Sequence, residues 1–223
     1  MNLAIDIGNT AVKWASFEGN TLVETGHGMP EALIARADRV LACASGDTKC
    51  EVPRLSADTP LPIKIDYKTP ATLGADRIAD ACGAWALHRG EASLIIDAGT
   101  CITVDFIDAN GVYHGGAIMP GLKMSLQALN SFTAKLPLVD INNVKRAPVL
   151  GRSTEESILA GTLGATMLAL AGYVALYREK APTLHVLLTG GDAQHLVDAG
   201  ATGWEMAPHL TFTGLNEIMT YDK

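Results

Sequence analysis

Acidic, hydroxyl and glycine residues stand together in the segment 94–105, which reads LIIDAGTCITVD. The β-branched residues on both sides predict two strands joined by a tight turn. Asp97 and Thr100 fall at that turn, with Gly99 between them. A glycine lets backbone N–H groups approach a bulky anion, a hydroxyl donates a hydrogen bond, and a carboxylate holds a cation or orients water. The segment is therefore a candidate anion-binding turn.

The same pattern occurs near the N-terminus, where residues 5–8 (IDIG) align with residues 96–99 (IDAG). The two copies are about ninety residues apart, well beyond the roughly 20–50 residues of a solenoid repeat. Lys13 follows the first turn and is either a solvated strand charge or a cation that faces a phosphate. A single hairpin of this kind is ordinary, but two of them, each after a buried strand, predict a duplicated domain with one anion-binding hairpin in each half.

A third informative stretch is 67–77, YKTPATLGADR, in which Gly74 allows an unusual turn before a helix. Asp76 and Arg77 fall in the first turn of that helix, and Ile78, Cys82 and Trp85 share its apolar face. An acid at a helix start is favoured by the helix dipole. It is equally the way in which an active-site acid and an anion-binding cation would be presented. On the residues alone, the two readings are about even.

Two later segments carry weaker signals. Ser153 with Glu156 three residues on forms a capping box, which accounts for the serine and leaves Thr154 free for a ligand. The strand 184–188 runs into Thr189-Gly190-Gly191-Asp192 and a helix through Val197. Glycines at a strand-to-helix junction let the backbone lie against a flat or phosphorylated ligand.

The elements that must position these residues follow from periodicity. Strands are expected at 3–7, 12–17, 21–24, 41–44 and 63–67, and helices at 30–41 and after Gly121. Asn110-Gly111 predicts a tight turn between strands. The polar segment 88–91 is the best boundary between two domains, 1–91 and 92–223.

Composition narrows the class of protein. The 223 residues carry a net charge of −7 and no basic run, which argues against a nucleic-acid partner. The four cysteines have no metal spacing and indicate reduced, mostly buried thiols in a cytoplasmic protein. The chain begins directly with a strand, and Asp6 interrupts any apolar region of the kind a signal peptide needs, so no signal peptide is expected.

One segment, 158–177, lacks charges over twenty residues and meets the length criterion for a membrane-spanning helix. It is rich in Ala, Gly and Thr and has no flanking basic cluster, so we expect a buried helix that packs through small residues rather than a membrane span. Such a helix is too apolar to be left on a surface, so the core or a twofold partner must cover it.

Taken as an ordered set, these runs resemble the actin, Hsp70 and sugar-kinase superfamily and, more closely, the type III pantothenate kinases. The supporting runs span nearly the full length: 6–10, Tyr67, 74–77, 97–100, 115–121, 133–137, and 151–154 with Gly161. The resemblance implies an α/β fold of two ribonuclease-H-like (actin-like ATPase) domains with an ATP cleft between them. The chain looks somewhat short for the family, and the loss is expected in loops of the first domain and around 140–150.

The resemblance also implies roles for individual residues. Phosphates of ATP, carried with Mg²⁺, would be bound by Asp6, Ile7, Gly8, Asn9, Thr10, Ala11, Val12 and Lys13, with a contact from Thr100. Pantothenate would be bound by Tyr67, Gly74, Ala75, Asp76, Arg77 and Thr154. Asp76 would accept the proton from the substrate hydroxyl. Asp97 would hold a monovalent cation, K⁺ or NH₄⁺, and the family forms homodimers.

The expected activity is therefore transfer of the ATP γ-phosphoryl group to the primary hydroxyl of pantothenate, giving 4'-phosphopantothenate, the first step toward coenzyme A. One alternative is another small-molecule kinase or a phosphatase of the same superfamily, which would not need Tyr67 together with the 74–77 run. The other is a non-catalytic regulatory relative, which would be expected to lack one of Asp6, Asp76 and Asp97, whereas all three are present.

Overall fold

The structure is a computed structural model that describes residues 1–8, 11–44 and 51–221. Its contacts divide the chain into two compact units. Unit 1 comprises Met1–Ser93, Phe106–Gly115 and His209–Lys223, and unit 2 comprises Leu94–Asp105 and Gly116–Pro208. The units interleave along the chain and so differ from the contiguous segments 1–91 and 92–223. The assignment of one ribonuclease-H-like domain to each of those segments stays a prediction.

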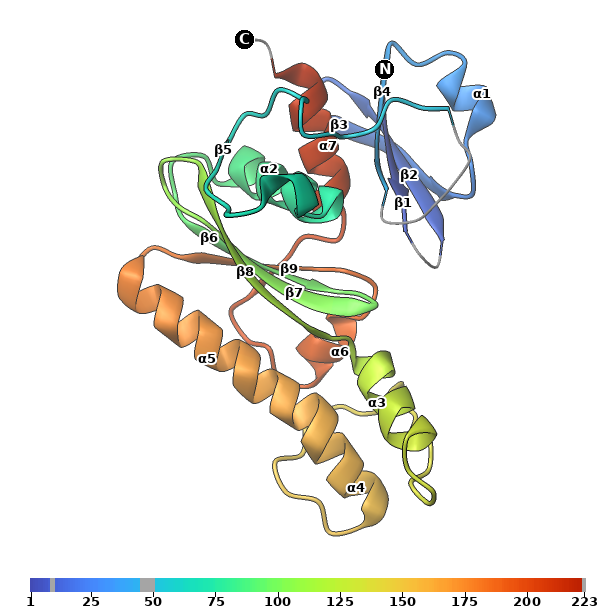
Figure 1. Cartoon of the computed structure of the whole chain (residues 1–223), viewed down its shortest axis with the longest axis vertical. Coiled ribbons are helices and arrows are strands. Elements are labelled where there is room, and N and C mark those ends of the chain that lie inside the picture. Colours follow the sequence, from blue (N-terminus) through green and yellow to red (C-terminus); the bar gives the residue numbers. More distant parts are fainter. Residues whose placement is uncertain (9–10, 45–50, 222–223) are drawn as a thin grey trace. The chain divides into compact units, whose positions relative to one another are not determined.

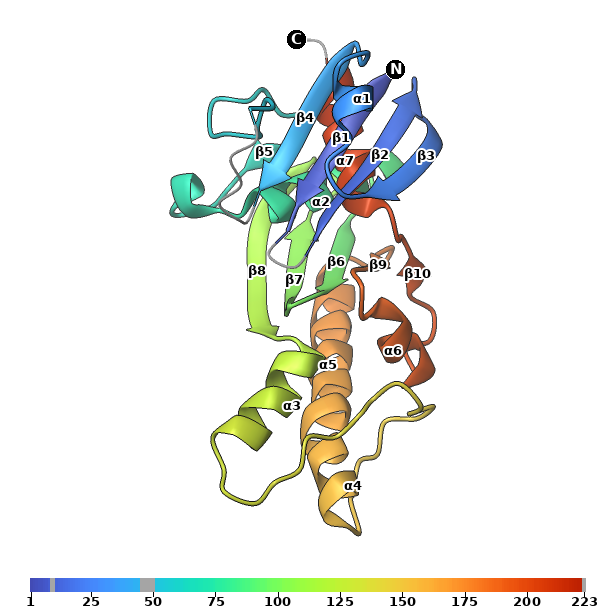
Figure 2. The ribbon, with the colours of Figure 1, turned by 90° about the vertical axis from the view of Figure 1, so that its right-hand side faces the viewer.

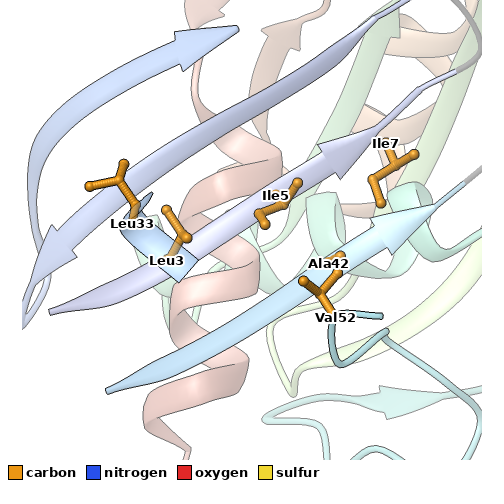
Figure 3. Packing of buried hydrophobic residues seen from close by; sticks show 6 residues of the cluster. All are labelled: Leu3, Ile5, Ile7, Leu33, Ala42 and Val52. Carbon is orange, nitrogen blue, oxygen red and sulfur yellow. The ribbon is translucent and has the colours of Figure 1, made fainter. Parts of the chain in front are cut away.

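Unit 1 contains a four-stranded sheet in the order β3-β2-β1-β4 (Figure 1). Its strands are β1 Asn2–Ile7, β2 Val12–Glu18, β3 Thr21–His27 and β4 Arg39–Ala44. β1 pairs antiparallel with β2 and parallel with β4. Figure 3 shows the core on this sheet, where Leu3, Ile5 and Ile7 of β1 lie with Leu33, Ala42 and Val52. The three expected N-terminal strands are confirmed.

The helix expected at 30–41 is wrong. Only α1, Glu31–Ile34, is helical, and β4 begins at Arg39. Val40 and Leu41 lie beside Leu3 and Ala4 in the parallel register, so pairing with β1 decides their conformation. Their apolar spacing suited a helix equally well, because short apolar runs do not distinguish the two.

Two helices pack together in unit 1: α2, Ala75–Leu87, and α7, Leu210–Thr220. A 3₁₀ turn, η1 Pro70–Thr72, precedes α2. Ile78 and Cys82 of α2 are buried and Trp85 is half-buried, which confirms the expected face. The helices approach closely because both carry glycine at the crossing: a Cβ on Gly214 would lie 1.7 Å from the carbonyl oxygen of Ala79. The helix α7 was not predicted from the sequence.

The second sheet has six strands in the order β10-β9-β6-β7-β8-β5. Their bounds are β5 Lys64–Ile65, β6 Ser93–Ala98, β7 Cys101–Ile107, β8 Val112–Pro120, β9 His185–Thr189 and β10 Glu205–Met206. β6 and β7 form the expected hairpin, and residues 94–96 are fully buried. The turn at 110–111 is confirmed too, with Gly111 at a positive φ of 73°.

Unit 2 carries the remaining helices, which are α3 Leu122–Ser131, α4 Thr154–Leu159, a π-helical turn η2 Ala160–Gly164, α5 Ala165–Lys180 and α6 Ala193–Asp198. Leu122 and Leu126 of α3 are buried, as expected for its apolar face. Ser153 caps α4: its Oγ accepts the Glu156 N–H at 3.2 Å, and Glu156 Oε2 accepts the Arg152 N–H at 2.6 Å. The serine cap is confirmed, although the Glu156 carboxylate accepts from the N–H of Arg152 rather than of Ser153, and α6 follows the glycine junction as predicted.

The expectation that 158–177 is a buried helix is wrong for the single chain. Within α5 only Leu170 and Val174 are buried, whereas Leu168 and Leu176 are 62% and 58% exposed. A Cβ on Gly161 or Gly172 would meet no atom within 4 Å, so these small residues do not pack closely here. Thr154–Lys180 is also the one helix, among the described residues, that is long and apolar enough to cross a membrane, and a third of its most apolar window is buried. Figure 2 shows α4 and the start of α5 running on beyond the strands.

Candidate functional site

The β1–β2 turn of unit 1 carries most of the residues predicted to bind phosphate. Gly8 donates its N–H to the Ala11 carbonyl across the turn at 3.1 Å, and Ala11 is exposed. Asp6 and Lys13 are direct partners in the antiparallel register, so an acid and a cation flank the turn. Ile7 points into the core and offers its backbone, and Val12 is half-buried. Asn9 and Thr10 lie outside the described residues.

Asp6 is held by a neighbour that the sequence analysis missed. Cys43 lies beside Asp6 in the parallel β1–β4 register, and its Sγ donates to Asp6 Oδ1 at 3.4 Å. Burial raises the pKa of the Asp6 carboxyl, against the hydrogen bond from Cys43 and the charge of Lys13, which lower it. The charge of Asp76 raises that pKa further, so Asp76 acts on Asp6 within unit 1. Strand pairing thus brings together Asp6, Lys13 and Cys43.

Asp76 stands in the first turn of α2, as predicted. Its Oδ1 accepts the Arg77 N–H at 2.8 Å, and Gly74 is the residue before the helix. A Cβ on Gly74 would lie 2.5 Å from Asp76 Oδ1, so the glycine leaves the space that this carboxylate occupies. Ala75 and Asp76 are both half-buried. The carboxylate is therefore held in place near the helix start.

An aromatic pair supports the neighbouring cation. The Arg77 guanidinium lies 5.9 Å from the centroid of the Tyr67 ring, and that ring lies 6.2 Å from the buried Tyr113 ring. Gly115 has φ +84°, and a Cβ there would lie 2.9 Å from Tyr67 Cε2. Its lack of a side chain makes room for Tyr67. Tyr67, Gly74, Ala75, Asp76 and Arg77 therefore all lie in unit 1, with Tyr67 against Arg77.

In unit 2, the β6–β7 turn carries Asp97 and Thr100. Gly99 donates its N–H to the Cys101 carbonyl at 2.9 Å, the counterpart of the Gly8 bond. The glycine junction after β9 packs against this turn: a Cβ on Gly190, which has φ +94°, would lie 2.3 Å from Asp97 Oδ1. Thr100 is exposed. Carboxylate and backbone oxygens at one turn are the ligands that hard cations prefer.

An ion pair secures that glycine junction. Asp192 is buried, its N–H donates to the Ala98 carbonyl at 2.8 Å, and its Oδ1 accepts from Lys123 Nζ at 2.7 Å. Lys123 belongs to α3, and Gly121 before it donates its N–H to the Thr100 carbonyl at 3.1 Å. The Gly-Gly pair was predicted from the sequence, whereas the role of Lys123 was not. No sequence spacing links residues 123 and 192, so only the fold reveals their contact.

Thr154 lies elsewhere in unit 2. It lines an open pocket of about 740 Å³ together with Leu129, Leu136, Gly151, Arg152, Ser153, Ser157, Ile158 and Gly161. Neither Asp97 nor Thr100 is among these lining residues. The predicted residues therefore lie at the β1–β2 turn and around the start of α2 in unit 1, and at a turn and a pocket in unit 2.

Chemically, unit 1 offers a half-buried acid at a helix start beside a second acid and two cations. Unit 2 offers a glycine-lined turn with a carboxylate. Such groups suit phosphoryl transfer, which depends on positioned phosphates, charge neutralisation and an oriented nucleophile rather than on a covalent intermediate.

Proteins with similar sequences are kinases, which agrees with this chemistry. The sequence profile of the type III pantothenate kinases matches residues 35–176. A type III pantothenate kinase of Phocaeicola vulgatus is 38% identical over 242 residues, covering 100% of this chain and 99% of the relative. One from Cytophaga hutchinsonii is 37% identical over 236 residues, with both chains fully covered.

Solved structures show the same fold at low sequence identity. A conserved Campylobacter jejuni protein assigned to the Baf family of transcriptional activators has a TM-score of 0.66 at 20% identity, covering 97% of this chain and 96% of its own. A glucokinase from an Antarctic psychrotroph has a TM-score of 0.51 at 11% identity, covering 97% of each chain. The predicted α/β fold of the actin-like ATPase and sugar-kinase superfamily is confirmed.

Proposed function

Because this chain belongs to the type III pantothenate kinase family, we propose how its own residues share the work of phosphorylating pantothenate. The reaction uses ATP and is the first step of coenzyme A biosynthesis. The match of the whole chain to type III pantothenate kinases supports this activity. The proposal concerns the roles of the residues, the metal ions and the assembly.

Asp76 is the proton acceptor for the primary hydroxyl of pantothenate. An alcohol is a poor nucleophile until its proton is directed away, and a carboxylate within hydrogen-bond reach accepts that proton as the bond to phosphorus forms. The observation that supports this role is the fixed position of Asp76 at the start of α2, where its charge acts on Asp6.

The β1–β2 turn binds the phosphates of ATP. The turn supplies the backbone of residues 7–12, the Asp6 carboxylate and the Lys13 ammonium. The Thr100 hydroxyl of the β6–β7 turn is a further hydrogen-bond donor to ATP. Lys13 offsets the repulsion between Asp6 and the phosphates. Mg²⁺ accompanies ATP and neutralises charge that develops on the transferred group.

Asp97 holds a monovalent cation, K⁺ or NH₄⁺. A carboxylate at a phosphate-binding turn repels ATP unless a cation lies between them. The residues present fit such an ion, because a Cβ on Gly190 would fill the space beside Asp97 Oδ1 and the Ala98 carbonyl. When bound, the ion supplies positive charge at the turn.

Tyr67, Gly74, Ala75, Arg77 and Thr154 bind pantothenate. Arg77 suits the substrate carboxylate, since a guanidinium matches the geometry of two carboxylate oxygens. Tyr67 lies against Arg77 and limits the positions open to its guanidinium. Thr154 lines its own pocket in unit 2.

The active form is a cytoplasmic homodimer. The exposed aliphatic side chains of α5 support this assembly, because a twofold partner would remove them from water. Reduced Cys43, Cys82 and Cys101 suit a reducing compartment.

The test is substrate-dependent ADP release. The protein with MgATP and K⁺ is expected to release ADP with pantothenate and not with a panel of sugars. Release with a sugar but not with pantothenate would assign the chain to another kinase of the superfamily. Absence of release with every substrate, at normal ATP binding, would favour a regulatory relative.

A further inference from the structure

Cys43 lies directly behind the acid of the proposed phosphate-binding turn. It is 1% exposed, belongs to β4 and pairs in register with Asp6 of β1. Its Sγ lies 3.4 Å from Asp6 Oδ1, within the range for a hydrogen bond that involves sulfur. Asp6 is 37 residues away in sequence, so sheet pairing alone creates this contact.

The thiol keeps its proton and so acts as the donor. Burial, and after it the nearby charge of Asp6, raises the pKa of Cys43 well above its ordinary value, and Asp80 and Asp76 add to the effect. A thiolate beside these carboxylates is therefore disfavoured at neutral pH. A protonated thiol is a weak donor, and the ionised carboxylate accepts its hydrogen bond.

We propose that Cys43 is a positioning residue for phosphoryl transfer, because its S–H···Oδ1 bond fixes the Asp6 carboxylate beside the ATP phosphates. This inference rests on the proposed role of Asp6. A carboxylate on a strand rotates about its χ angles, and Lys13 on the neighbouring strand attracts it from the other side. The hydrogen bond from Cys43 holds Oδ1 of Asp6 in place. The orientation of the other carboxylate oxygen, Oδ2, is thereby fixed as well.

The expected effect is specific to ATP. Removing the donor is expected to raise KM for ATP about 3- to 10-fold, the range that a modest hydrogen bond gives. KM for pantothenate stays unchanged, since Cys43 acts through Asp6. A role in packing alone would not separate the two substrates.

The experiment compares variants that differ in volume and in donor. Cys43→Ala removes both, Cys43→Val fills the space without a donor, and Cys43→Ser keeps a donor. Cys82→Ala is the matched control, because Cys82 is equally buried in unit 1 and its pKa is raised by burial, Glu217 and Asp80, with no part from Asp6. Steady-state rates are measured with each substrate varied at saturation of the other, and melting temperature reports folding.

We expect Cys43→Ala and Cys43→Val to raise KM for ATP, and Cys43→Ser and Cys82→Ala to resemble the parent. Equal kinetics of Cys43→Ala and Cys82→Ala would overturn the proposal, as would a serine variant as impaired as the valine variant. If Cys43→Ala does not fold, the comparison of Ser with Val decides.

Asp6→Asn separates this inference from the role on which it depends. If Asp6→Asn leaves KM for ATP unchanged, the proposed role of Asp6 is wrong. If Asp6→Asn is impaired and Cys43→Val is not, only the inference about Cys43 fails. In the double variant, loss of the thiol is expected to add nothing to the effect of Asp6→Asn, and additive effects would contradict action through Asp6.

Discussion

Asp76 allows a sharp test at the level of a single side chain. Asp76→Asn keeps the shape and removes the proton acceptor, so kcat is expected to fall while ATP still binds. A general base contributes on the order of 10²–10⁴ in rate, and the loose transition state of phosphoryl transfer favours the lower part of that range. Single-turnover and steady-state rates measure the loss.

The control for this change is Asp58→Asn, since Asp58 is an exposed acid of the same unit. A nearly normal kcat in Asp76→Asn would return Asp76 to the role of a helix-end charge. A melting temperature close to that of the parent establishes that the loss is chemical.

From the proposed role of Asp97, we expect the activity of the enzyme to require a monovalent cation. Activity is expected to collapse when K⁺ and NH₄⁺ are replaced by tetramethylammonium at constant Mg²⁺, because the bulky ion cannot enter beside Asp97. Asp97→Asn is expected to weaken the dependence on K⁺. Full activity of the parent in tetramethylammonium would refute the cation site.

Asp6 predicts a dependence of stability on pH. Its folded pKa is raised, mainly by burial, so this carboxyl favours folding below its ordinary pKa of 3.8 and loses that contribution as pH rises through the raised value. At neutral pH the ionised group costs stability. Asp6→Asn is therefore expected to raise the melting temperature of the ligand-free protein at neutral pH.

That gain should shrink as the pH falls through the raised pKa and vanish below 3.8, where Asp6 is protonated in both the folded and the unfolded protein. Glu24→Gln, at an exposed acid on β3, serves as the control and should show no such gain. A melting temperature of Asp6→Asn below that of the parent at neutral pH would show that the ionised acid stabilises the fold.

At the level of elements, the crossing of α2 and α7 positions Asp76. Thr211 of α7 donates to Asp80 of α2 at 2.6 Å, and Gly214 lies against the backbone of Ala79. Gly214→Ala must push the helices apart and is expected to destabilise the protein by about 1–3 kcal/mol. Urea unfolding measures this, with Thr213→Ala on the same helix as the control. A loss no larger than that of the control would mean that the crossing adapts freely.

These elements show which parts of the fold and of the site can be predicted from the sequence. Both hairpins and the start of α2 follow from local signals: β-branched strands, turn glycines and Gly74. The helix α7 was not predicted because its Thr and Gly residues are poor helix formers. Its packing on α2 and β1 compensates for their low helix propensity. The contacts of Cys43 with Asp6 and of Lys123 with Asp192 join distant segments, so no local pattern could predict them.

At the level of the whole molecule, α5 predicts a dimer. Leu168 and Leu176 are each more than half exposed on an apolar helix. Sedimentation is expected to show a dimer at micromolar concentration, and the double change Leu168→Glu with Leu176→Glu to shift it toward monomer. Val23→Glu, at an exposed residue on β3, is the control. A parent protein that sediments only as a monomer at this concentration would refute the assembly.

The interleaving of the units has a consequence for synthesis on the ribosome. α7 packs against β1, yet about 200 residues separate the two in the chain. At roughly 5–20 residues per second, α7 emerges about 10 to 40 seconds after β1. Until then the nascent sheet and α2 lack the helix that covers them, and they expose apolar surface to chaperones. Unit 1 begins first but completes its fold only after all of unit 2 has been translated.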